Sequence, residues 1–133
     1  MRLTVHVDGG ARGNPGPAAI AAVVTDSDGQ VVHEAHETIG RATNNVAEYR
    51  ALIFGIERAA ELGATELELV GDSELIVKQV RGEYRVKDAG LKPLHSAAQQ
   101  ALASFAEWQI RHVKREANAE ADALVNQALD AEG

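Results

Sequence analysis

Cysteine is absent from the 133 residues of this chain, which excludes disulfide bonds and thiolate metal sites. A chain without cysteine suits a reducing compartment, and we expect a cytoplasmic protein. Long hydrophobic runs are also lacking, because charged or polar residues interrupt every apolar stretch. The sequence therefore predicts neither a signal peptide nor a membrane-spanning helix.

The length of the chain limits its organisation. A chain of 133 residues is long enough for one hydrophobic core but not for two, so we expect a single domain over residues 1–133 and a monomer. Apolar residues make up 45% of the chain and charged residues 25%, the balance of an ordinary globular protein.

Basic residues are fewer than acidic ones, 13 against 20. The resulting net charge of -7 argues against a large basic surface for nucleic acid. The basic residues nevertheless concentrate in two segments. These are Lys78, Arg81, Arg85, Lys87 and Lys92, followed by Arg111, Lys114 and Arg115. Both segments could neutralise phosphate groups locally, or they could be solvated surface charges.

Hydrophobic periodicity predicts an α/β fold with the element order βββαβααβα. Strands are expected at Arg2–Asp8, Ala18–Thr25, Gln30–Thr38, Thr65–Val70 and Trp108–Val113. Helices are expected at Asn45–Leu62, Ser73–Val80, Leu91–Phe105 and up to Leu129 from an N-cap at Asn118, with frayed residues from Asp130 to Gly133. The result is a five-stranded mixed sheet, three antiparallel and then two parallel strands, flanked by helices.

Four carboxylates occupy positions that local structure alone explains poorly: Asp8, Glu48, Asp72 and Asp122. Asp8 and Asp72 are expected at the ends of the first and fourth strands, which makes them neighbours if those strands are parallel and adjacent. Glu48 and Asp122 are expected in the first turns of two helices, at the edges of the apolar faces. Each acid taken singly could be a turn or helix-cap residue. Together they favour a site for hard cations such as Mg²⁺ or Mn²⁺.

Four segments resemble type 1 ribonuclease H, in order and along nearly the whole chain. They are DGGARGNPGPA, TNNVAEYRAL, GDSELIVKQV and HVKREANAEADAL. The pieces D-G-G, T-N-N-x-x-E, D-S and N-x-x-x-D are specific as a set, although each alone is weak. The chain is most similar to the compact subgroup of archaea and actinobacteria, because residues 78–92 leave no room for the longer type's basic helix and handle loop. The resemblance implies the ribonuclease H-like fold.

The same resemblance implies an endonuclease that hydrolyses the RNA strand of RNA–DNA hybrids, leaving 5′-phosphate and 3′-hydroxyl ends. Duplex RNA is a further candidate substrate. Asp8, Glu48, Asp72 and Asp122 match the family's metal-binding, catalytic carboxylates. The implied cofactor is a pair of Mg²⁺ ions, with Mn²⁺ as a substitute, one activating the attacking water and the other stabilising the departing 3′-oxygen.

Substrate contacts are likewise carried over by resemblance. The matching residues are Gly9, Gly10, Asn14, Thr43, Asn44, Asn45, Ser73 and Asn118. The glycines would let the backbone approach the RNA strand, and the Asn44 and Asn45 amides suit 2′-hydroxyl groups. The plain alternative for this Asn pair is a turn and helix cap. Glu74 departs from the longer type and would repel phosphate unless it turns away.

Two residues are candidates for an auxiliary catalytic role. Counting back from Asp122, His112 occupies the position where the longer type has a mobile histidine. Arg115 is the other candidate, and we favour it for a member of the compact subgroup. Other readings of the whole chain are another nuclease or polynucleotidyl transferase on this fold, a non-catalytic hybrid-binding module, and a plain structural domain. The last of these leaves the four acids and the Asn pair as coincidences.

Overall fold

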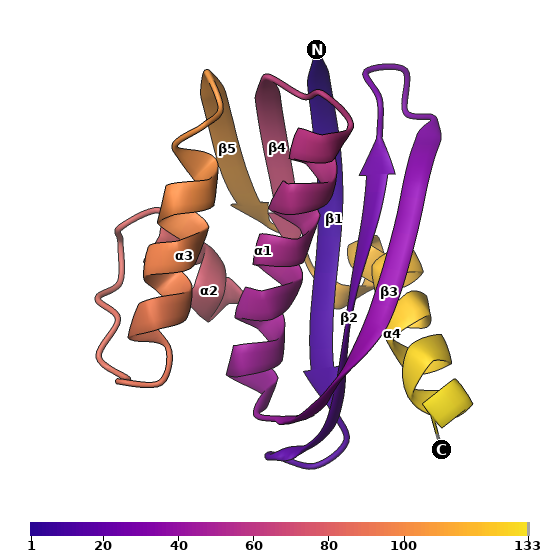
Figure 1. Ribbon diagram of the computed structural model, residues 1–133, viewed down its shortest axis with the longest axis vertical. Helices are drawn as coiled ribbons and strands as arrows, with labels where there is room; N and C mark the ends of the chain where they lie inside the picture. The colour runs from indigo at the N-terminus through magenta and orange to yellow at the C-terminus, as the bar shows by residue number, and fades with distance from the viewer. Residues whose placement is uncertain (133) are drawn as a thin grey trace.

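A computed structural model describes residues 1–132, which form one mixed sheet with helices on both faces (Figure 1). The strand order is β3-β2-β1-β4-β5. The strands are β1 (Arg2–Ala11), β2 (Gly16–Thr25), β3 (Val31–Ala42), β4 (Glu66–Gly71) and β5 (Glu107–His112). The helices are α1 (Asn44–Glu61), α2 (Glu74–Val80), α3 (Lys92–Leu102), the 3₁₀ helix η1 (Arg115–Asn118) and α4 (Ala119–Glu132).

The sheet has the predicted mixture of strand directions. β1 pairs antiparallel with β2, and β2 pairs antiparallel with β3. β1 also pairs parallel with β4, from Arg2 opposite Glu66 to His6 opposite Val70, and β4 pairs parallel with β5. The expected fold class and the adjacency of the first and fourth strands are confirmed.

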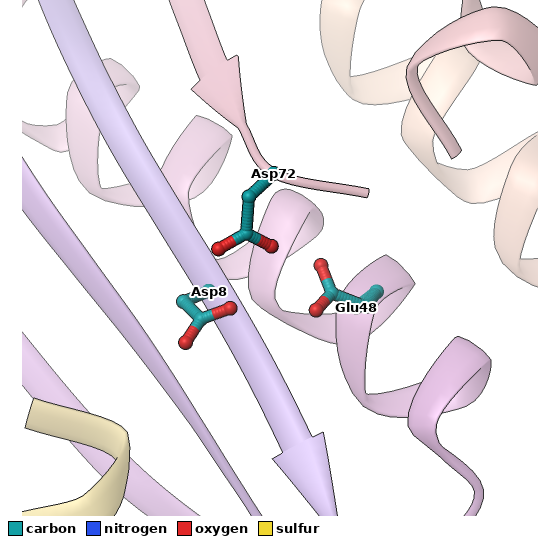
Figure 2. Close-up of side chains that lie close together, drawn as sticks. All are labelled: Asp8, Glu48 and Asp72. Carbon is teal, nitrogen blue, oxygen red and sulfur yellow. The ribbon is translucent and has the colours of Figure 1, made fainter. Parts of the chain in front are cut away.

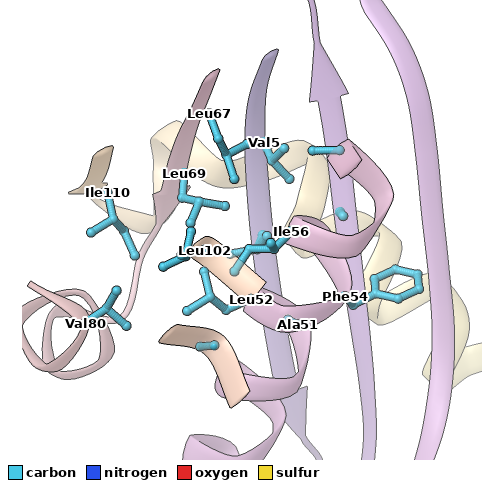
Figure 3. Close-up of a cluster of buried hydrophobic side chains, with 14 of the residues drawn as sticks. Val5, Ala51, Leu52, Phe54, Ile56, Leu67, Leu69, Val80, Leu102 and Ile110 are labelled. Carbon is cyan, nitrogen blue, oxygen red and sulfur yellow. The ribbon is translucent and has the colours of Figure 1, made fainter. Parts of the chain in front are cut away.

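The two faces of the sheet are covered unequally. The larger core lies under α1, α2 and α3, where Leu52 and Ile56 of α1 meet Val5, Leu67 and other strand residues (Figure 3). On the other face α4 packs against β2 through a small cluster: Ala19, Ala21, Val125, Ala128 and Leu129. Within residues 1–132 no helix is both long and apolar enough to cross a membrane.

Glycine in the middle of α1 allows the helix to lie close to the centre of the sheet. A Cβ atom at Gly55 would lie 2.6 Å from Val7 Cγ1 and 2.9 Å from Val5 Cγ1, closer than packed atoms tolerate. Gly55 therefore brings α1 against β1, although glycine weakens a helix interior by about 1 kcal/mol relative to alanine.

Several predicted boundaries were wrong, because the first strand runs to Ala11 instead of Asp8 and the third to Ala42 instead of Thr38. Residues 9–11 lie beyond the predicted end of the first strand, but in the structure they continue the antiparallel ladder opposite residues 18–20 of β2. Asp8 thus lies inside β1, two residues beyond the last parallel pair with β4. α4 also continues to Glu132 instead of fraying from Asp130, while Gly133 lies outside the described residues.

The predicted helix starts also shift. α1 begins at Asn44 with Thr43 as its N-cap, the Thr43 hydroxyl accepting from the Val46 amide, so Glu48 lies beyond the first turn. Asn118 is the last residue of η1 and is not the side-chain cap of α4: within residues 1–132 its Oδ1 atom accepts no hydrogen bond, while its Nδ2 atom donates to the Val7 carbonyl oxygen. The connection from α2 to α3 contains no helix or strand, as the compact pattern predicts.

Candidate metal centre

Three of the four expected acids meet near the carboxyl end of β4. Asp8 comes from β1, Glu48 from α1, and Asp72 from the residue that follows β4; their carboxylates face one another (Figure 2). One oxygen of each lies within 4.8 Å of one oxygen of the other two. Asp8 is only 6% exposed. Residues separated by up to 64 positions therefore form one acidic cluster.

Gly9 allows Glu48 to reach this cluster. A Cβ atom at Gly9 would lie 2.2 Å from the carbonyl oxygen of Ala47 and 2.8 Å from the amide nitrogen of Glu48. The Gly9 backbone also hydrogen-bonds to the Glu48 carboxylate. Gly9 was expected to permit approach of the RNA strand; in the structure its missing side chain permits the approach of α1.

The cluster places unfavourable charge in a partly dry environment. Burial raises the pKa of Asp8 to about 7, with repulsion from Asp72 and Asp122 adding to the effect, while the Arg115 guanidinium opposes it. Burial, followed by repulsion from Asp8 and Asp72, raises the pKa of Glu48 well above its ordinary value, against the opposing Gly9 hydrogen bond. Without a cation, this site holds protons on groups that are normally ionised at neutral pH.

Asp122 belongs to the same site, at a slightly greater remove. It lies outside the group of three acids within 4.8 Å but hydrogen-bonds to the Asp8 carboxyl. Both acids line an open cleft of about 450 Å³, together with Glu48, Asp72 and Arg115. The remaining lining residues are Gly9, Gly10, Ala11, Arg12, Asn44, Asn45, Ser73, Val125, Asn126 and Leu129.

Asn118 connects η1 to β1 and to Asp72 beside this cleft. Its Nδ2 atom donates to the carbonyl oxygen of Val7 at 2.8 Å and lies 3.4 Å from Asp72 Oδ2. The side chain is 1% exposed, so its contacts are with the protein. Asn118, expected among the substrate-binding residues, instead attaches η1 to β1 and to one of the acids.

The other expected substrate contacts divide into two groups. Asn44, Asn45 and Ser73 line the cleft, and the Ser73 hydroxyl also caps α2 by accepting from the Ile76 amide. Asn14 and Thr43 do not line it. Instead they support the residues next to the cleft: Asn14 Oδ1 accepts from the Asn44 amide at 3.0 Å, and Thr43 caps α1.

Asn44 joins the turn after β1 to the start of α1. Its Oδ1 atom accepts from the Ala11 amide at 2.9 Å, while its own amide donates to Asn14. The plain reading of the Asn pair as a helix cap is therefore wrong for Asn44, because Thr43 is the cap.

The two auxiliary candidates occupy different places. Arg115 lines the cleft and acts on the Asp8 carboxyl, whereas His112 ends β5 as an exposed residue outside the lining. Sequence analysis missed Arg12 and Asn126, which also line the cleft. Both could have been found from the sequence. Arg12 is the single basic residue inside DGGARGNPGPA, and Asn126 follows Asp122 by one helical turn, which places both on the same face of the helix.

The donor set fits a hard divalent cation. All four acids of the cleft offer carboxylate oxygen, and the chain has no cysteine to favour a softer metal. Burial, followed by repulsion among the acids, raises the pKa values of Asp8 and Glu48 and so disfavours their ionised forms. Neutralisation by Mg²⁺ or Mn²⁺ would remove that penalty.

The strand order, the helix arrangement and the acidic cleft define a protein of the ribonuclease H-like fold class. The family model described as "Reverse transcriptase-like" matches residues 6–128. The ribonuclease HI of Halobacterium salinarum is 48% identical over 129 residues, which cover 97% of this chain and 65% of that protein. The chain belongs to the type 1 ribonuclease H family.

Solved structures agree with this assignment. The crystal structure of the Halobacterium salinarum RNase H1 matches with a TM-score of 0.97 and 47% identity, covering 98% of this chain and 99% of that one. The N-terminal RNase H domain of Mycobacterium tuberculosis Rv2228c matches with a TM-score of 0.94 and 46% identity, covering 98% and 94%. The LC11-RNase H1 crystallised with an RNA/DNA hybrid matches with a TM-score of 0.93 and 43% identity, covering 98% of each chain.

Several curated relatives are longer than the part that aligns. The chain spans 65% of the Halobacterium salinarum protein and 36% of the bifunctional Mycobacterium tuberculosis protein.

Proposed function

We propose that this chain is an endoribonuclease that hydrolyses the RNA strand of RNA–DNA hybrids and leaves 5′-phosphate and 3′-hydroxyl ends. The observation that carries the proposal is the convergence of Asp8, Glu48 and Asp72 within 4.8 Å. Support comes from the 43% identity to a ribonuclease H1 that was crystallised with an RNA/DNA hybrid.

Asp8, Glu48, Asp72 and Asp122 would hold two divalent cations, Mg²⁺ in the first instance. When bound, such ions supply a nucleophile at neutral pH and charge stabilisation for an in-line phosphodiester displacement. The residues of the chain orient this chemistry. Asn118 donates a hydrogen bond to Asp72, and Gly9, which has no side chain, lets α1 bring Glu48 to the cluster.

Substrate orientation would fall to the polar residues around the acids. Asn44, Asn45 and Ser73 carry donors and acceptors on the cleft wall, which suits 2′-hydroxyl and phosphate oxygens. Asn14 and Thr43 keep the Asn44 backbone in place, and Gly10 leaves the cleft wall without a side chain. We assign the auxiliary catalytic role to Arg115, because it lines the cleft and His112 does not.

The test uses labelled RNA–DNA hybrid, duplex DNA and duplex RNA, each with Mg²⁺, Mn²⁺ or EDTA. We expect metal-dependent cutting of the RNA strand of the hybrid and none in EDTA. Products should be extended by a polymerase from their 3′ ends and should accept a labelled 5′-phosphate only after phosphatase treatment. Cleavage of duplex DNA with an intact hybrid would favour another nuclease of this fold, and no cleavage of any substrate would overturn the proposal.

A variant assay links the activity to the acidic cluster. Asp72→Asn keeps the size of the side chain but removes one metal-binding charge, and we expect turnover to fall by at least roughly 100-fold, since outer partners of metal ligands alone account for up to that factor. Asp28→Asn, which removes the same charge from the exposed β2–β3 turn, is the matched control and should cut at the wild-type rate. Equal rates for both variants would remove Asp72 from the site.

The assembly and the location of the protein complete the proposal. We propose that residues 1–133 act as one ribonuclease H domain, as a monomer and in the cytoplasm, where a chain without cysteine is suited to reducing conditions. Size-exclusion chromatography with light scattering tests the monomer, and a concentration-dependent dimer would contradict it.

A further inference from the structure

We propose that Arg12 binds a phosphate of the RNA strand and that Asp130 holds the Arg12 guanidinium when no substrate is present. The inference rests on the proposed function, because it assumes a nucleic-acid strand in the acidic cleft. It adds a binding residue and a competing internal partner, and both act on how the substrate is held.

The charge of the cleft creates the need for such a residue. Its described lining includes four carboxylates, and two residues in that lining carry positive charge: Arg12 and Arg115. A polyanionic strand entering this cleft meets repulsion from any acid that bound cations leave uncompensated. Arg115 lies close enough to Asp8 to act on its pKa, which leaves Arg12 as the cleft cation available to a phosphate away from the acids.

The backbone of Arg12 is held by the surrounding turn, whereas about half of its side chain is exposed to solvent. The Arg12 amide donates to the carbonyl oxygen of Pro17 at 2.8 Å. A Cβ atom at Gly16 would lie 2.1 Å from the Arg12 carbonyl oxygen, so the turn between β1 and β2 is closely packed against this residue. The side chain is 48% exposed. A fixed backbone together with an exposed guanidinium suits the binding of a ligand that arrives from solvent.

Asp130 occupies the guanidinium in the absence of substrate. Arg12 Nη2 donates to Asp130 Oδ1 at 2.6 Å, joining the turn after β1 to the last part of α4; these segments lie at the same end of the molecule (Figure 1). Asp130 is 70% exposed, so water screens the pair and the pair contributes little to stability. A phosphate can therefore replace the carboxylate, because it can accept two parallel hydrogen bonds from a guanidinium where Asp130 accepts one.

The experiment measures kcat and KM for a short RNA–DNA hybrid over a range of KCl concentrations. Arg12→Ala should raise KM roughly fivefold with kcat nearly unchanged, because one charge-assisted contact made in both ground and transition states is lost. The slope of log affinity against log salt should become shallower by about one phosphate contact. Asp130→Asn should lower KM, because it frees Arg12 for the substrate.

Matched controls separate the contact from a general change of charge. Arg2→Ala removes an exposed, ion-paired arginine from the opposite end of β1, and Glu61→Gln removes an exposed carboxylate paired with Arg58. Both should leave the salt slope as in the wild type. An Arg12→Ala slope equal to that of Arg2→Ala would overturn the proposal. So would a higher KM in Asp130→Asn, because the pair would then support the cleft as a unit.

Hybrid binding in EDTA provides a readout that does not depend on cleavage. Fluorescence anisotropy with a labelled hybrid should show the shallower salt slope for Arg12→Ala and tighter binding for Asp130→Asn. Failure of the wild type to cut the hybrid would count against the proposed function alone, whereas an unchanged slope in a cutting enzyme would count against Arg12 alone.

Discussion

At the scale of single residues, bringing the acids together makes their ionisation at neutral pH unfavourable. Asp8 is nearly buried, and its pKa of about 7 means that ionisation at neutral pH is unfavourable in the metal-free protein. Buried carboxylates are ordinarily paired with basic groups, but Asp8 and Glu48 lie among other acids. This arrangement is expected of groups that await a cation.

Arg115 and His112 give opposite expectations when each is truncated. Arg115→Ala should lower kcat by roughly tenfold or more, because the guanidinium is a positive group beside the reacting acids. His112→Ala should change kcat by no more than about twofold, as expected of an exposed residue outside the cleft. Single-turnover cleavage of a saturating hybrid measures the difference; a larger loss in His112→Ala would reverse the assignment.

At the scale of secondary-structure elements, the position of α1 decides the geometry of the site. α1 approaches β1 at Gly55 and at Gly9, where any side chain would meet atoms of the other element. Because Glu48 lies on α1 and Asp8 on β1, the spacing between these elements sets the distance between two carboxylates of the candidate metal site.

Gly9→Ala should therefore impair both stability and metal binding. The added methyl group forces α1 away from β1, which we expect to lower the free energy of unfolding by about 1–3 kcal/mol and to weaken Mg²⁺ binding. Gly10→Ala is the matched control, because its Cβ atom would lie 3.7 Å from Val125 Cγ1 in ordinary contact. Urea unfolding and calorimetric titration with Mg²⁺ measure the two effects. Equal behaviour of both variants would show that the approach of α1 at Gly9 is not critical.

The order of these elements could be predicted from periodicity, but their ends were predicted less well. Gly9 and Gly10 were expected to follow the end of the first strand, yet β2 provides hydrogen-bonding partners that extend β1 to Ala11. Asn118 read as a helix cap, yet the side chain reaches Val7 on another strand. The partners of residues 9–11 are on the other strand of the hairpin, and Val7 lies 111 positions from Asn118, so the residue type at these positions does not by itself report the contact.

At the scale of the whole molecule, stability and metal binding are linked through pH. The folded-state pKa of Asp8, about 7, lies above the ordinary value of 3.8. Protonated Asp8 thus favours the folded state, and this contribution is fully present below pH 3.8 and lost as pH rises to about 7. Glu48 shifts in the same direction.

Metal-free wild type should accordingly lose stability relative to Asp8→Asn as pH rises from about 4 to about 7, by at most about 1.4 kcal/mol for each pH unit. Urea unfolding in EDTA at several pH values measures this difference. Saturating Mg²⁺ should abolish or reverse the trend, because the bound cation favours ionised ligands. A difference that stays constant over this pH range would contradict the raised pKa of Asp8.

The sequence by itself predicted the class of the fold, the order of strands and helices along the chain and the four acids as site candidates. Strand and helix periodicity is a local property, and the motifs around Asp8, Glu48, Asp72 and Asp122 are contiguous in the chain. The adjacency of β1 and β4 was only a condition for bringing Asp8 and Asp72 together, and the parallel pairing in the structure meets that condition.

Only the tertiary structure decided how the remaining residues serve the site. It assigned Gly9 to the packing of α1, Asn118 to a buried tie between η1 and β1, and Arg12 to the cleft beside Asp130. Each of these roles depends on a partner 38 to 118 positions away. Such contacts exist only once the sheet has brought its elements together, so their physical cause is packing and not local propensity.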